Sequence, residues 1–271
     1  MAGYQPCDIG FHVDCLEREG ALLADAAARA GLAAPVPSCP DWQVRDLLAH
    51  TGHVHSWAAG IVGRPSTGPA PKPDEQEVLR QAPDGAALLD WYREQHAALV
   101  QTLRSADPDV DCWAFLPVSS PLAFWARRQA HETAIHRTDA ELAAGGGGAA
   151  GEGTPGAVTP HTAKFAADGV DELLAGFLAR NMRAGRWHGR PGVLGVHADD
   201  GPAGQAGWLV TTGPDGPAVA RGTGRADCDV TGPAAALYLA LWNRAPVTGL
   251  RVEGDAALLA ELRSGLQIRW S

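Results

Sequence analysis

Residues 125–139 read WARRQAHETAIHRTD, and this stretch is expected to form a helix that carries Glu132 and His136 four residues apart. At about 100° per residue, the two side chains point within roughly 40° of each other, one turn apart on one face. A carboxylate and an imidazole placed in this way can share one metal ion. His131 lies roughly 140° around the helix from His136, so we expect it outside that site.

The motif in this helix is H-E-x-x-x-H. Zinc proteases instead carry H-E-x-x-H, in which two histidines four residues apart hold zinc and the glutamate acts as the base. The spacing therefore excludes the protease interpretation.

A third ligand is expected from residues 41–62, DWQVRDLLAHTGHVHSWAAGIV, which have the pattern of a second amphipathic helix. Asp41 is a suitable N-cap for this helix. His50 occupies the one polar position of its buried seam. The apolar positions of that seam are Leu47, Val54, Trp57 and Ile61.

The helix that carries Glu132 and His136 has a similar inward stripe, formed by Leu122, Trp125, Gln129, Glu132, His136 and Ala140. Burying the three groups His50, Glu132 and His136 without partners would cost about 1 to 3 kcal/mol each, and more for the charge. One divalent metal would satisfy all three, and zinc with an open fourth position is a known catalytic arrangement. The alternative is a hydrogen-bonded core histidine and an exposed Glu/His pair.

The chain has 271 residues, which suits two domains, and no apolar run long enough to span a membrane. Its N-terminus lacks a basic region followed by an apolar one, so we expect a cytoplasmic protein. Five cysteines without a C-x-x-C pair argue against a disulfide framework or a zinc ribbon.

The formal net charge is -9, and the longest basic cluster is the pair Arg127 and Arg128. This balance argues against nucleic acid and against an anionic membrane as partner. A small molecule remains as the expected partner.

Residues 1–144 contain four helical patterns and are expected to form a four-helix bundle. Residues 145–160, GGGGAAGEGTPGAVTP, are expected to be a flexible linker, because no G-K-[ST] follows the glycines. Residues 161–271 begin with a helical pattern and continue with short segments separated by Gly, Pro and Asp. They are expected to form a smaller α+β domain with an antiparallel sheet.

Three segments resemble the mycothiol-dependent maleylpyruvate isomerase family. CPDWQVRDLLAH at residues 39–50 is similar to its first signature, and RRQAHETAIHRTDAEL at residues 127–142 to its second. ADCDVTGPAAALYLALWNR, followed by RVEGDAALL, resembles its C-terminal domain, which is related to sterol carrier proteins. The resemblance implies a DinB-like bundle with one zinc on His50, Glu132 and His136. It also implies mycothiol, the low-molecular-weight thiol of actinobacteria, as cosubstrate.

Under this resemblance the thiol would enter the open zinc position and lose its proton, since a coordinated thiol is deprotonated. Adding the thiolate to an activated alkene, rotating the resulting single bond and expelling the thiol would isomerise cis to trans. Stopping after addition or displacement would make the protein a thiol S-transferase. The electrophile could belong to natural-product biosynthesis or to detoxification.

Other residues are candidates for contacting the substrate or supporting the ligands. They are His53, His131, Arg137, Asp139, Trp57, Trp125, Arg221 and Arg225. A solvent-facing histidine is the alternative for His53, a structural ion pair for Asp139 and core packing for the two tryptophans. Arg221 and Arg225 could reach an anionic substrate.

Two other classes of function stay open. The protein could be a zinc hydrolase in which metal-bound water attacks an ester or amide. It could also be a non-enzymatic module that binds a small apolar ligand and retains a vestigial metal site. Turnover without mycothiol would favour the hydrolase, and a chain without stoichiometric metal would favour the binding module. Both a monomer and a homodimer are compatible with the sequence.

Overall fold

The computed structural model describes residues 7–64, 66, 68–71, 74–145, 158–178, 180, 190–200, 206–213 and 218–266. The chain divides into two compact units, one built from Asp8–Thr159 and the other from Met1–Cys7 with Pro160–Trp270. The glycine-rich linker predicted at residues 145–160 lies largely outside the described residues. Helices form the first unit, and helices with a sheet form the second, so the expected fold class is confirmed.

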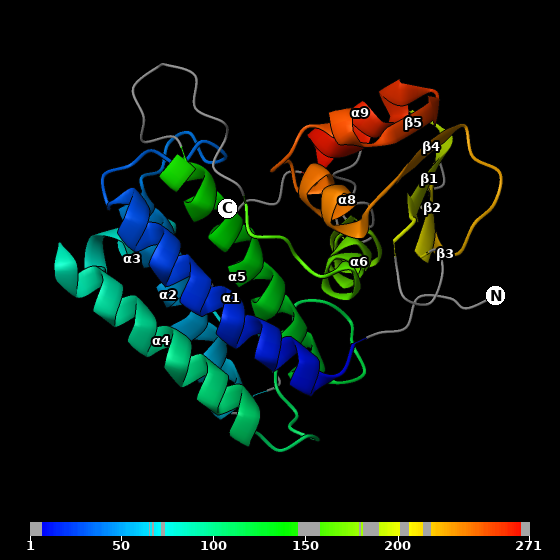
Figure 1. Cartoon of the computed structure of the whole chain (residues 1–271). Coiled ribbons are helices and arrows are strands. Elements are labelled where there is room, and N and C mark those ends of the chain that lie inside the picture. The colour runs from blue at the N-terminus through cyan, green and yellow to red at the C-terminus, as the bar shows by residue number, and fades with distance from the viewer. Residues whose placement is uncertain are drawn as a thin grey trace. The chain divides into compact units, whose positions relative to one another are not determined.

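Four long helices lie side by side in the N-terminal unit (Figure 1). They are α1 (Ile9–Ala30), α2 (Val44–Gly63), α4 (Ala86–Ser105) and α5 (Pro121–Gly145), with the short α3 (Glu75–Gln81) between α2 and α4. α1 packs against α5 and α4, and α2 packs against α4 and α5. Buried apolar side chains face inward, as helical spacing predicts, for example Leu16 of α1, Leu47 of α2, Leu99 of α4 and Trp125 of α5.

The beginning of α2 differs from the prediction that Asp41 is its N-cap. The N-cap is Gln43, whose backbone N–H donates to the carboxylate of Asp46. Two backbone hydrogen bonds, from Val36 to Trp42 and from Val44 to Ala34, pair the two ends of the preceding loop. The helix therefore begins only at Val44, and Trp42 is left on a fixed loop.

The C-terminal unit contains a five-stranded sheet with the order β3-β2-β1-β4-β5. Its strands are β1 (Gly192–Ala198), β2 (Ala206–Thr212), β3 (Ala218–Arg221), β4 (Cys228–Gly232) and β5 (Arg251–Gly254). The prediction of an antiparallel sheet is wrong for one pair, because β1 and β4 run parallel. After the edge strand β3, the chain crosses to the other side of β1, and β4 runs in the same direction as β3 and β1.

Helices cover one face of this sheet. They are α6 (Ala163–Asp171), continued by a π-helical segment η1 (Glu172–Leu178), then α8 (Ala234–Leu241) and α9 (Ala256–Gly265), with the 3-10 turn η2 (Val247–Gly249) before β5. α8 and α9 contact β1 and β4. Alternate strand residues, such as Leu194, Val196 and Val210, point into this core, as the period of two requires.

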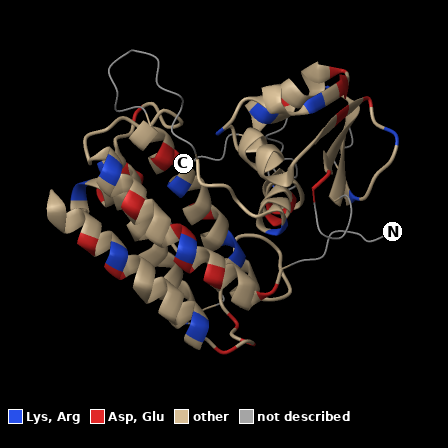
Figure 2. Ribbon diagram, viewed as in Figure 1, with Lys and Arg blue, Asp and Glu red and all other residues tan. Residues whose placement is uncertain are grey.

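No described helix is long and apolar enough to cross a bilayer. Along the helices of the N-terminal unit, acidic and basic positions are interspersed in the view of Figure 2.

Candidate metal centre

Three side chains from two helices of the N-terminal unit converge on one point. His50 Nε2 on α2 lies 3.3 Å from Oε1 of Glu132 on α5, and His136 Nε2 lies 3.3 Å from the same oxygen. Their ligand atoms are all within 4.8 Å of one another. His50 and His136 are buried, and the side chain of Glu132 is 13% exposed. The three residues predicted from helical geometry are therefore brought together.

The antiparallel pairing of α2 and α5 explains why these residues meet. His50 contacts Glu132, and seven residues further along α2 the ring of Trp57 lies 5.2 Å from that of Trp125, seven residues earlier on α5. Both pairs lie on the inward seams that the apolar pattern predicted. Each helix thus presents its polar seam residue at the same level of the bundle.

The second carboxylate oxygen of Glu132 has a different partner. Nη2 of Arg128, one turn earlier on α5, donates a hydrogen bond to Oε2 over 3.0 Å, and the Arg128 side chain is only 4% exposed. Arg128 was not predicted as a site residue. Its position four residues before Glu132 was the available signal, since residues at i and i+4 face each other on a helix.

His136 is fixed from its other ring nitrogen. Nδ1 lies 3.0 Å from Oδ2 of the fully buried Asp139, whose Oδ1 accepts a short hydrogen bond from the Ser38 hydroxyl. A carboxylate at Nδ1 favours the tautomer in which this nitrogen is protonated and Nε2 carries the lone pair. Asp139 therefore contacts one of the converging histidines, and its role in supporting a metal ligand stays a prediction. Ser38 was not predicted.

The electrostatics of the three groups differ sharply. Burial alone would raise the pKa of Glu132, but hydrogen bonds from His136 and His50 and the charge of Arg128 hold it well below its ordinary value. Burial also acts against protonated His136, yet Asp139 and Glu132 outweigh it and raise its pKa to about 9. For His50, burial dominates and lowers the pKa. The site is thus an anionic carboxylate flanked by two imidazoles of unequal basicity.

Trp42 covers the two imidazoles. Its ring centroid lies 4.9 Å from that of His50 and 6.1 Å from that of His136, and the side chain is partly exposed. The loop before α2 carries both Trp42, which contacts the two imidazoles, and Ser38, which contacts Asp139. An aromatic ring at this position limits the access of water to the histidines.

An aromatic cluster occupies the next turns of the seam. Trp57 packs edge to face against both Trp125 and Trp113. The Trp113 and Trp125 rings are tilted relative to each other, and the Trp125 indole N–H donates to the Trp113 carbonyl over 2.8 Å. Phe115 and Phe124 extend the cluster. Trp125 is therefore fully buried and Trp57 partly buried, along the same seams as the three converging side chains.

The remaining candidates of the N-terminal unit lie off the centre. His53 packs against Trp91 with ring centroids 5.0 Å apart, its Nε2 is buried without a hydrogen-bond partner among the described residues, and burial lowers its pKa. His131 is fully buried, with its ring 6.1 Å from that of His12 on α1. His131 does not join the three converging groups, as predicted.

Arg137 belongs to a buried ion-pair network. It donates to Glu19 on α1 over 2.8 Å and to Glu141 over 2.6 Å, and its side chain is fully buried. Glu141 in turn accepts from the backbone N–H and the hydroxyl of Thr159. Arg137 thus ties α1 to α5, and its guanidinium group is committed to this structural role.

The two arginines proposed from the C-terminal unit have different surroundings. Arg221 makes two hydrogen bonds, 2.6 and 2.8 Å long, to the fully buried carboxylate of Asp171, which also accepts from Trp208. The expectation that Arg221 is available to an anionic substrate does not fit this pairing. Arg225 is exposed, and a role in substrate binding stays a prediction for it alone.

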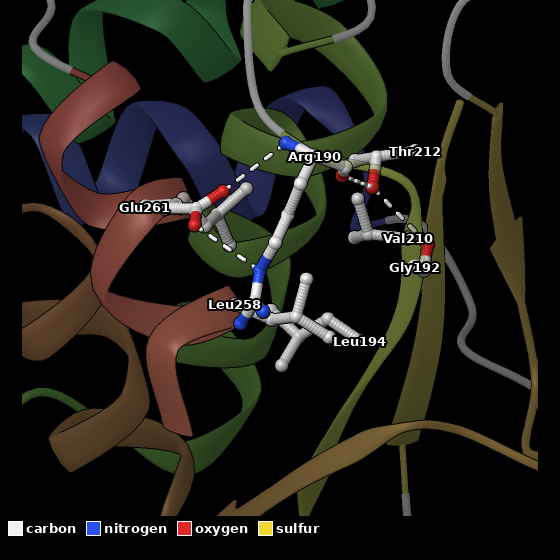
Figure 3. Close-up of a pocket in the computed structure, with 8 residues that line it drawn as sticks. Arg190, Gly192, Leu194, Val210, Thr212, Leu258 and Glu261 are labelled. Atoms are coloured by element: carbon white, nitrogen blue, oxygen red, sulfur yellow. Dashed lines mark hydrogen bonds and ion pairs between the residues drawn. The ribbon is translucent and has the colours of Figure 1, made fainter. Parts of the chain in front are cut away.

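A separate small hollow lies within the C-terminal unit (Figure 3). Its apolar wall includes Leu194, Val210 and Leu258, and the ion pair between Arg190 and Glu261 lies at one side. The Arg190 backbone N–H also donates to Glu261. These polar groups satisfy each other, so the hollow offers apolar contact and lacks the converging ligand atoms of the bundle site.

Comparison with known proteins gives three results. Residues 13–141 match the family described as mycothiol maleylpyruvate isomerase N-terminal domain, and residues 164–261 match the corresponding C-terminal domain. Crystal structures of the mycothiol-dependent maleylpyruvate isomerase and of a histidine-to-alanine mutant have a similar fold. Each has a TM-score of 0.60 and 12% sequence identity, covering 93% of this chain and 96% of the other. No curated protein matches the sequence.

Proposed function

The chain belongs to the mycothiol maleylpyruvate isomerase family, and we propose that it is a zinc enzyme that activates mycothiol for attack on an electrophilic small molecule. The observation that carries this proposal is the convergence of His50 Nε2, His136 Nε2 and Glu132 Oε1 on one point. The proposed site holds one zinc per chain. We also propose a cytoplasmic location.

The donor set fits zinc. Two imidazole nitrogens and one carboxylate oxygen are ligands that zinc accepts in catalytic sites, where three protein ligands leave a fourth position open. Bound here, zinc would supply a position at which a thiol is held as the thiolate, the nucleophilic form. The hydrogen bond that the Nδ1–H of His136 donates to the Asp139 carboxylate is typical of histidines that bind metals.

The charges around the site support an anionic ligand. Arg128 contributes one positive charge and Asp139 one negative charge, which cancel. A divalent ion with Glu132 leaves one net positive charge. A single thiolate balances that charge, whereas a second anion would exceed it.

The residues of the chain have distinct tasks in this proposal. Asp139 and Ser38 orient His136, and Arg128 orients Glu132. Trp42 shields the imidazoles, which lowers the local dielectric and strengthens the electrostatic interactions. These groups hold a nucleophile in place, and none of them needs to bond covalently to the substrate.

Two reactions are compatible with such a site. The thiolate sulfur adds to one carbon of an activated cis alkene, and the electron pair of the double bond moves to the electron-withdrawing group. Rotation about the new single bond and expulsion of the thiolate then return the double bond in the trans form, with no net change in atoms. If the adduct instead gains a proton and leaves, the product is a thioether, and the enzyme is an S-transferase.

The experiment measures metal content and thiol dependence on the same preparation. We expect about one zinc per chain and conversion of maleylpyruvate, or formation of a mycothiol conjugate detected by mass spectrometry, only when mycothiol is added. Glu132→Ala should lose both zinc and turnover, while Glu94→Ala, a change at an exposed glutamate on α4, should retain both. Turnover by the metal-loaded protein without mycothiol would contradict the proposal and favour a hydrolase.

A further inference from the structure

The carboxylate of Glu132 has two oxygens in unlike surroundings. Oε1 lies 3.3 Å from each of the two histidine Nε2 atoms, at the centre of the proposed site. Oε2 points to Arg128 Nη2, 3.0 Å away. The carboxylate is thus divided between the metal-binding point and a cation on its own helix.

A carboxylate without such a partner can bind a metal ion through one oxygen or through both. With both oxygens bound, Glu132 would occupy the position that a thiol needs. Charge-assisted hydrogen bonds are about twice as strong as neutral ones, and the burial of both side chains strengthens this one further. Arg128 therefore competes directly with the metal for Oε2.

The helix makes this competition effective. Arg128 and Glu132 are four residues apart on α5, so their side chains lie on neighbouring turns of one rigid element. Arg128 is nearly excluded from solvent, and buried guanidinium groups keep their charge at all ordinary pH values. Glu132 cannot turn Oε2 toward the metal point without leaving a buried arginine with one fewer acceptor.

We propose that Arg128 is a positioning residue that restricts Glu132 to one metal-binding oxygen and so keeps a coordination position open for the thiol. This inference rests on the proposed function of the site. A general loss of structure would weaken metal binding and thiol binding together. Removing Arg128 should preserve metal binding and weaken thiol binding.

The test uses the full chain loaded with Co²⁺, whose visible absorption reports the coordination number, and N-acetylcysteamine as a neutral probe thiol. In Arg128→Met, we expect the absorption of the thiol-free complex to weaken, as it does when a fifth ligand atom binds. We expect the Kd for N-acetylcysteamine to rise about tenfold or more, matching the loss of a charge-assisted hydrogen bond. The Kd for Co²⁺ should stay within about threefold of the wild type or fall.

Two further variants control for charge and for folding. Arg127→Gln removes the same charge one residue away, where the side chain is only partly buried, and should leave the spectrum and both Kd values unchanged. Arg128→Lys keeps the charge but offers a single donor, and it should restore most of the thiol affinity. If Arg128→Met does not fold, Arg128→Lys provides the test. We then expect the Co²⁺ absorption of Arg128→Lys without thiol to be weaker than that of the wild type.

The outcomes separate this inference from the proposed function. A Co²⁺ spectrum and a thiol Kd that are unchanged in Arg128→Met would overturn the role of Arg128 and leave the metal-thiol function intact. Loss of Co²⁺ binding in Arg128→Met would also overturn it, because Arg128 would then support metal binding itself. A wild-type chain that binds Co²⁺ but no thiol would overturn both proposals.

Discussion

The N-terminal bundle contains two layers of buried histidine that differ in their partners. In the candidate metal centre, His50 and His136 share the carboxylate of Glu132. In the second layer, His55 Nε2 lies 2.8 Å from the Thr133 hydroxyl, and His96 Nε2 lies 3.0 Å from the Leu16 carbonyl oxygen. Both layers use imidazoles on inward faces, so burial alone does not separate them.

The pKa values follow the partners. Burial lowers the pKa of His55 well below its ordinary value and also lowers that of His96. His136 is also buried, yet Asp139 and Glu132 raise its pKa to about 9. A histidine in this bundle therefore becomes a candidate ligand where α5 supplies a carboxylate, and a neutral core residue where α5 supplies a hydroxyl.

The largest expected effect distinguishes the two layers directly. His50→Ala should weaken zinc binding at least about 100-fold, because it removes one of three ligands, a larger loss than the 10- to 100-fold typical of a supporting residue. His55→Ala should leave zinc affinity within about threefold and instead lower the free energy of unfolding by about 1 to 3 kcal/mol, since it leaves Thr133 unpaired. Chelator competition and urea denaturation measure the two quantities. Equal losses of zinc affinity in both variants would remove the distinction.

The next effect concerns the carboxylate that supports His136. Asp139→Asn keeps the shape of the side chain but removes its charge, and we expect zinc affinity to fall by about 10- to 100-fold. The matched change in a carboxylate away from the centre is Asp90→Asn on the exposed face of α4, which should leave the affinity unchanged. A zinc affinity that is equal in the two variants would show that Asp139 has only a structural role.

The pH dependence of the metal-free protein sharpens the same contrast. Because the folded-state pKa of His136 is raised above the ordinary 6.5 to about 9, protonated His136 stabilises the fold fully below about pH 6.5, and this contribution is lost as pH rises through 9. Asp139 and Glu132 face this group as anions, and His50 faces it as a neutral ring because burial lowers its pKa. We expect Tm to fall by about 2 to 4 °C for each kcal/mol lost.

The control for this pH series is Asp139→Asn, in which His136 loses its main partner and the fall in Tm between pH 6.5 and 9 should shrink. Scanning calorimetry with a chelator present measures both proteins. A Tm that rises over this interval in the metal-free wild type would contradict the assignment, because it would require a lowered pKa for His136.

Helical periodicity explains how much of the centre could be predicted. His50, Glu132 and His136 follow from the seams of two helices, because the direction of a side chain on a helix depends only on its position in the sequence. Arg128 obeys the same rule and could have been found from its spacing to Glu132. The helical character of the first unit and the mixture of helices and strands in the second were also predictable from local patterns.

The unpredicted parts depend on contacts between distant segments. Ser38 reaches Asp139 across 101 positions of sequence, through a loop whose path is set by backbone hydrogen bonds around Trp42. The ion pair between Arg221 and Asp171 was not predicted, because the two residues lie 50 positions apart, on different elements. The parallel pairing of β1 with β4 likewise depends on a crossing of the chain that strand patterns do not show.

The smallest expected effect tests whether that loop contributes to the centre. Ser38→Ala removes the hydrogen bond that the Ser38 hydroxyl donates to Asp139. It leaves in place the hydrogen bond between His136 Nδ1 and Asp139. A single hydrogen bond is worth about 0.5 to 1.5 kcal/mol, so zinc affinity should fall by only about 2- to 10-fold. Ser105→Ala, at an exposed serine near the end of α4, should not change the affinity.

If Ser38→Ala lowers stability in urea but leaves zinc affinity equal to that of Ser105→Ala, the hydrogen bond anchors the loop and does not affect metal binding through Asp139. If both zinc affinity and the Tm difference between pH 6.5 and 9 decline together, the chain Ser38, Asp139 and His136 acts as one unit, and the contrast with the His55 layer extends to the loop.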